Sequence, residues 1–104
     1  MPVQFLALLK TKPDTPREKI GPLLKPEAAK VWEMLAAGVL RSIHYINGSQ
    51  SPVGAALLFE VNDRVAVEAH VKQLPLVEHG LLSVEVLPLS PFTGFATLFA
   101  APTV

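Results

Sequence analysis

Apolar residues are concentrated in four segments of strand length along the chain. They cover residues 3–10, 39–46, 53–61 and 81–89. Each segment is rich in branched and aromatic side chains and is bounded by turn-forming residues, which is typical of β-strands. Only a short turn sequence, Asn-Gly-Ser-Gln-Ser-Pro, separates the second segment from the third. These two segments therefore predict a β-hairpin.

A helical pattern occupies the region between the first two strands. The sequence Thr-Pro-Arg-Glu at 15–18 has the spacing of a capping box, which predicts a helix start. Apolar residues continue at helical spacing up to Gly38, which suits a left-handed C-terminal cap. An interior proline costs a helix about 3 kcal/mol. We therefore expect an irregular opening and a firm helix over residues 26–37, because prolines interrupt the first half at Pro22 and Pro26.

A second helix is predicted between the third and fourth strands. Asn62 or Asp63 can cap its start, and Pro75 is expected to end it. Its apolar stripe consists of Val67, Val71 and Leu74. The element order is then βαββαβ, which predicts an α+β, ferredoxin-like fold with a four-stranded antiparallel sheet and two helices on one face.

The two faces of the predicted sheet differ in polarity. Period-two alternation assigns a continuous apolar set to the helix side and a mixed set to the other side. The mixed set consists of Gln4, Leu6, Leu8, Lys10, Leu58, Glu60, Glu85 and Leu87. So many leucines on a bare face would be poorly soluble, so we expect a second copy to pack against it, face to face, in a homodimer or higher homo-oligomer.

Residues 1–90 form the predicted domain, and residues 91–104 form an apolar tail. Phe92, Phe95, Leu98 and Phe99 share one face at helical spacing. This face is too apolar to lie in water, so it should either pack on a neighbouring subunit or close a ligand pocket, and we expect the inter-subunit role.

The composition of the chain indicates which kinds of partner and which cellular compartment to expect. Nine basic residues balance nine acidic ones and no basic cluster occurs, so nucleic acid is not an expected partner. The sequence contains no Cys and no signal-peptide pattern, and no apolar run is long enough to span a membrane, so a cytoplasmic protein without membrane contact is expected.

Three short motifs resemble the muconolactone isomerase family of the dimeric α+β barrel superfamily. They are Gly38-Val39-Leu40-Arg41, Gln73-Leu74-Pro75-Leu76 and Val84-Glu85-Val86. The resemblance implies sheets packed face to face in a dimer, a small-molecule pocket between sheet and helices or near the barrel interior, and neither metal nor organic cofactor. Two regions depart from the isomerase pattern: a longer span after Leu76 and a more apolar C-terminal tail.

A lactone isomerase needs an acid/base pair and a cation for the substrate carboxylate. Arg41 is the leading candidate because it is a charge within an apolar strand, and guanidinium binds carboxylates bidentately. The structural alternative is an ion pair with Glu60 or Glu85. Glu60 is a candidate base or the partner of Arg41.

His44 and Tyr45 must lie on opposite faces of the strand that contains Arg41. Alternation places Tyr45 on the Arg41 side, as a substrate-binding candidate, unless a bulge near the turn exchanges the two. His44 is a candidate catalytic residue or an inert, hydrogen-bonded one.

Two further residues are candidates for substrate contact. Trp32, the only tryptophan, is expected in the core or in a pocket wall. His79 precedes Gly80, and a tight turn there can aim its ring at solvent or at the pocket mouth. The three histidines lack metal-ligand spacing, so no metal site is predicted.

The leading functional hypothesis is an isomerase that transfers protons on a small lactone or carboxylate metabolite. The alternative is a non-catalytic, small-ligand-binding barrel in which Arg41 and the carboxylates merely pair. A cofactor-free monooxygenase is a third, less favoured hypothesis.

Overall fold

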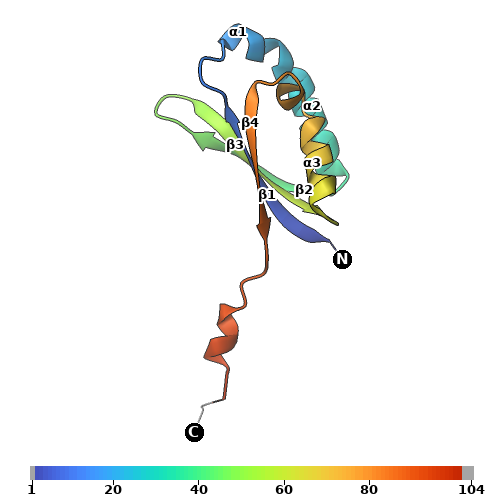
Figure 1. Cartoon of the computed structure of the whole chain (residues 1–104), viewed down its shortest axis with the longest axis vertical. Coiled ribbons are helices and arrows are strands. Elements are labelled where there is room, and N and C mark those ends of the chain that lie inside the picture. Colours follow the sequence, from blue (N-terminus) through green and yellow to red (C-terminus); the bar gives the residue numbers. More distant parts are fainter. Residues whose placement is uncertain (1, 102–104) are drawn as a thin grey trace.

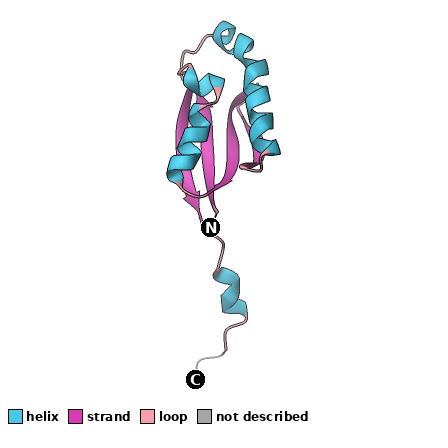
Figure 2. Cartoon of the chain, turned by 90° about the vertical axis from the view of Figure 1, so that its right-hand side faces the viewer, coloured by secondary structure: helices cyan, strands magenta, loops and turns pink. Residues whose placement is uncertain are grey.

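The computed structural model describes residues 2–101 and contains one four-stranded antiparallel sheet. The strands are β1 (Val3–Thr11), β2 (Leu40–Asn47), β3 (Pro52–Val61) and β4 (Leu82–Leu89), in the spatial order β2-β3-β1-β4. All of the helices between strands lie on one face of this sheet (Figures 1 and 2). The predicted α+β, ferredoxin-like fold is therefore confirmed.

The first helical region is broken, as the prolines predict. It consists of α1 (Arg17–Ile20), the 3-10 turn η1 (Gly21–Leu23) and α2 (Leu24–Ala36). Pro22 lies in the 3-10 turn and Pro26 in the first turn of α2, where its missing N–H removes no helical hydrogen bond. Gly38 follows α2 with φ of 79°, the left-handed conformation that its position predicted.

The predicted capping box at the start of the first helical region is wrong. The N-terminal cap of α1 is Pro16, which makes no side-chain capping bond. The Thr15 hydroxyl instead donates to the carbonyl of Lys12 at 2.7 Å. This local bond stabilises the turn after β1, and α1 begins one residue later than a Thr15 cap would require.

The second helical region differs from its prediction at the C-terminal end. Asp63 caps α3 (Arg64–Lys72) by accepting a hydrogen bond from the Ala66 amide at 2.8 Å, as expected. The helix ends before Pro75, and Leu74 has the extended conformation (φ −71°, ψ 126°) that a following proline favours, as predicted. What the sequence did not predict is that Pro75 also starts another helix, the short α4 (Pro75–Glu78), since proline is favoured at a first helical position.

The hydrophobic core lies between the sheet and the helices. Phe59 and Ala7 from the sheet and Val67 and Leu74 from the second helical region are each 0% exposed. Strand pairing confirms the predicted helix-side set, because Ala7 aligns with Leu57 on β3 and with Val86 on β4. The core therefore fixes which sheet face the helices cover.

The C-terminal tail points away from the domain in Figures 1 and 2. It contains the 3-10 helix η2 (Gly94–Leu98). Of the predicted apolar face, Phe92 is 72% exposed and Phe99 is 84% exposed. Residues 102–104 of the predicted tail lie outside the described residues.

Candidate functional site

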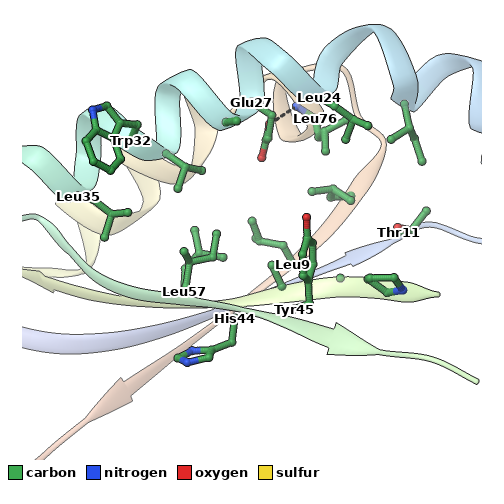
Figure 3. Close-up of a pocket in the computed structure, with 18 residues that line it drawn as sticks. Leu9, Thr11, Leu24, Glu27, Trp32, Leu35, His44, Tyr45, Leu57 and Leu76 are labelled. Atoms are coloured by element: carbon green, nitrogen blue, oxygen red, sulfur yellow. Dashed lines mark hydrogen bonds between the residues drawn. The ribbon is translucent and has the colours of Figure 1, made fainter.

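A cavity of about 670 Å³ lies between α2 and the sheet, open to solvent on one side. Leu9 and Leu57 from the two central strands form part of its floor, and Leu24 and Leu35 from α2 form part of its roof (Figure 3). The space exists because Ala55 and Gly54 occupy the central strand β3 beneath the helix. Small residues at this point leave room that larger side chains would fill.

The cavity contains one carboxylate, that of Glu27 on α2. Its Oε1 atom accepts a hydrogen bond from the backbone N–H of Leu76 at 2.9 Å. Figure 3 shows the carboxylate pointing from the helix into the cavity, toward the sheet. Desolvation by burial raises the pKa of Glu27 above its ordinary value of 4.5, and the bond from Leu76 opposes this rise. A half-buried carboxylate of this kind suits proton transfer.

Tyr45 from the sheet and Trp32 from α2 both form part of the cavity wall (Figure 3). The Tyr45 phenol extends from β2 toward α2, and its hydroxyl points into the space below Glu27 (Figure 3). Trp32 is 71% exposed and Tyr45 is 76% exposed, so both border the open side. Of the two positions predicted for Trp32, the structure shows the pocket wall.

A β-bulge at Arg41 overturns the predicted face assignment in β2. Leu40 pairs with Phe59 and Ser42 with Leu58, so Arg41 is an extra residue and the alternation shifts beyond it. His44 consequently lies on the outer face, away from the helices, and Tyr45 lies on the helix side. Tyr45 therefore does not share the Arg41 side, contrary to what simple alternation predicted. The exchange by a bulge, left open as the alternative, occurs, but the bulge that causes it lies at Arg41 and not near the turn.

Arg41 pairs with Glu60 on the outer face. Its Nε atom lies 3.8 Å from Oε2 of Glu60, and both side chains are partly exposed. Neither residue lines the cavity. His44 borders the cavity at the strand, but Figure 3 shows its imidazole pointing to the opposite side of the sheet. The structure therefore places the three predicted catalytic residues on the outer face and two of the three predicted substrate-binding residues at the cavity.

His79 lies apart from this cavity. It lines a smaller hollow of about 370 Å³ together with Glu18 and Lys19 of the first helical region. Its Nδ1 atom lies 2.9 Å from the carbonyl oxygen of Pro75. The ring is thus held by the carbonyl of the first residue of α4, and His79 is not among the residues that line the cavity bordered by Tyr45 and Trp32.

Glu27 is the functional candidate that sequence reasoning missed. It lies three residues after Leu24 and four before Val31, which places it on the apolar stripe of α2. An acidic residue on an apolar helix face is the signal that identifies it.

Residues 2–101 contain no group of three or more His, Asp or Glu side chains that could bind a metal ion. No helix in the same part of the chain is long and apolar enough to cross a membrane.

The family model for muconolactone delta-isomerase matches residues 4–94, which include all of the sheet except Val3, helices α1 to α4 and the whole cavity wall. The chain belongs to the muconolactone delta-isomerase family. Its cavity and Glu27 are therefore features of an isomerase-family domain. Among curated proteins, no significant match was found.

The fold is confirmed by its likeness to the solved structure of 5-chloro-2-hydroxyhydroquinone dehydrochlorinase from Burkholderia phenoliruptrix AC1100, in complex with 2,5-dihydroxybenzoquinone. It has a TM-score of 0.74 and 17% identity, over 88% of this chain and 97% of that one. A hypothetical Arabidopsis thaliana protein has a TM-score of 0.49 and 21% identity, over 88% of this chain and 89% of that one.

Proposed function

We propose that this isomerase-family chain moves a double bond in a small ring substrate, with Glu27 as the residue that transfers the proton. The observation that carries the proposal is a half-buried carboxylate, the only one in a mostly apolar cavity. Family membership supports the reaction class. The dehydrochlorinase of the same fold, solved with a dihydroxybenzoquinone, supports testing small oxygenated rings.

The proposed reaction consists of two proton transfers. The ionised Glu27 removes a proton from the carbon next to the substrate carbonyl, and the electron pair of the broken C–H bond forms an enolate. The carboxyl group of Glu27 exchanges its proton with solvent through the open side of the cavity and then donates a proton to the far carbon of the conjugated system, so the double bond moves by one position. Protons and electrons balance, because the product is an isomer of the substrate. A base with a raised pKa is suited to both steps near neutral pH.

Tyr45 is the proposed electrophile. Its hydroxyl points into the cavity from the wall opposite Glu27 (Figure 3), so a ring between the two side chains would meet a base on one side and a hydrogen-bond donor on the other. A donor placed where negative charge develops on the carbonyl oxygen stabilises the enolate. Trp32 is proposed to pack against the ring as the aromatic wall.

Deuterium exchange tests this proposal directly. Incubation of neutral butenolides with the protein in D2O should produce the shifted double bond and deuterium at the exchanged carbon, both visible by NMR. Glu27→Gln should reduce the rate by about 10²- to 10⁴-fold, the usual contribution of a general base. Glu33→Gln, on an exposed position of the same helix, is the matched control and should retain full activity. Full exchange by Glu27→Gln would disprove the assignment.

The catalytic role predicted for Arg41, His44 and Glu60 stays a prediction, and the cavity geometry supports Glu27 instead. Binding of butenolides without any exchange would favour the alternative function, a non-catalytic ligand-binding barrel. This outcome would leave the cavity as a binding site and remove the enzyme proposal.

We also propose a homodimer formed through the outer face of the sheet. Leu6, Leu8 and Leu58 lie on this face and are only partly buried in the single chain. A second sheet packed against them would remove this apolar surface from water. The exposed tail, with Phe95 64% exposed, is proposed to pack on a neighbouring subunit for the same reason.

A further inference from the structure

The cavity contains a potential negative charge and no permanent positive charge on its described lining. Apart from Glu27, the wall is formed by aliphatic, aromatic and small residues, with hydroxyl groups on Thr11 and Tyr45. The imidazole of His44 points away from it (Figure 3). None of the residues that line the cavity, all within the described part of the chain, is Lys or Arg.

The arginine that the sequence offers for a substrate carboxylate is not available at this site. Arg41 lies on the other face of the sheet, paired with Glu60 at 3.8 Å. The bulge that shifts the alternation of β2 brings Tyr45, a neutral hydrogen-bond donor, to the cavity instead. At the cavity, β2 therefore provides the Tyr45 hydroxyl, which can donate a hydrogen bond to a carbonyl oxygen but carries no positive charge to neutralise an anion.

A carboxylate bound in this cavity would lose water without gaining a counter-charge, which is costly. It would also lie near the carboxylate of Glu27, and like charges in a poorly solvated site repel. A neutral carbonyl compound carries neither penalty, and Tyr45 can donate a hydrogen bond to its oxygen. We infer that the cavity selects uncharged ring carbonyl compounds, such as neutral lactones, and discriminates against carboxylate-bearing ones.

This inference rests on the proposed function for the location of the substrate, but it concerns substrate class and is tested by binding alone. Muconolactone, a butenolide with an acetic acid arm, and its methyl ester form a matched pair that differs by one charge. Trp32 is the only tryptophan of the chain and borders the cavity, so its fluorescence reports occupancy. The ester should bind at least about tenfold more tightly than the acid at neutral pH, given the cost of an unpaired buried charge.

Two variants separate charge from shape. Leu24 lines the cavity on α2 and is 56% exposed, so Leu24→Lys places a cation at the rim without disturbing the core. It should strengthen binding of the acid and reduce the preference for the ester several-fold. Glu27→Gln should weaken the preference but keep its direction, because the apolar wall still provides no counter-charge. Glu33→Gln, outside the cavity, should bind both compounds as the unmodified chain does.

The possible outcomes are distinct. The inference is overturned if muconolactone binds as tightly as its methyl ester, or more tightly. It is also overturned if neither compound binds. Selective binding of the ester without deuterium exchange would uphold the substrate class and disprove the proposed isomerase activity. Selective binding with exchange would support both.

Discussion

The carboxylate of Glu27 on α2 caps the first turn of α4 by accepting the backbone N–H of Leu76 at 2.9 Å. The cap residue of α4 makes no side-chain bond of its own, so this N–H obtains its acceptor from another helix. The same bond orients the carboxylate toward the cavity in Figure 3. One interaction therefore joins two distant segments and positions the proposed base.

Loss of this acceptor should destabilise the fold. Glu27→Ala leaves the partly buried N–H of Leu76 unpaired, which typically costs about 1–3 kcal/mol. Glu27→Gln retains a carbonyl oxygen at this position and should be less destabilising. Urea unfolding of both variants gives the free energies. The control, Glu33→Ala at an exposed site, should change stability by less than about 0.5 kcal/mol. Equal stability of all three would contradict a structural role for the bond.

The raised pKa of Glu27 predicts a pH dependence of stability. The folded carboxyl keeps its proton to higher pH than the unfolded one, so the stabilisation it provides is complete below 4.5 and is lost as pH rises through the raised pKa. Glu27→Gln has no such loss. Its unfolding free energy, measured relative to the unmodified chain, should increase from acidic to neutral pH. A constant difference across this range would contradict the shift.

The pH dependence of turnover should have the same origin. The proposed base acts in its ionised form, so kcat/KM should rise with pH through a pKa above 4.5. A pH profile of the butenolide exchange rate measures it. If kcat/KM stays constant as the pH falls to 4.5, the ordinary pKa of a glutamate, another residue is the base.

The Arg41–Glu60 pair should contribute little to ligand binding. Arg41→Ala removes a partly exposed ion pair worth about 0–1 kcal/mol and no cavity contact. Fluorescence titration of Trp32 with the methyl ester should give an unchanged Kd. A large loss of turnover at unchanged stability would restore the catalytic role that the sequence predicted for Arg41.

Assembly through the outer face can be tested at Leu58, which pairs with Leu6 on the central strands. Leu58→Lys places a charge in the proposed interface and should yield monomers by light scattering. Val65→Lys, at a position 74% exposed on α3, is the control and should leave the assembly unchanged. A variant that unfolds is recognised by circular dichroism, and a chain that is monomeric before any substitution disproves the dimer.

The element order could be predicted from the sequence because it depends on local signals. Alternation, helical spacing and Asp63 as a cap act within a few residues, and the structure confirms the strands and helix-side set they predicted. The predicted Thr15 cap was wrong because the Thr15 hydroxyl bonds back to Lys12 in the turn and α1 begins one residue later, with Pro16 as its cap residue.

The site depended on the tertiary structure. Which face each side chain of β2 takes was decided by the bulge at Arg41, a feature of strand pairing that no local pattern records. Glu27 and Leu76 are 49 residues apart, and only the packing of α2 beside α4 brings them together. The sequence alone determined the layers of this protein, since periodicity is local. The tertiary structure decided which carboxylate meets the cavity, since burial and long-range hydrogen bonds arise only when the layers pack.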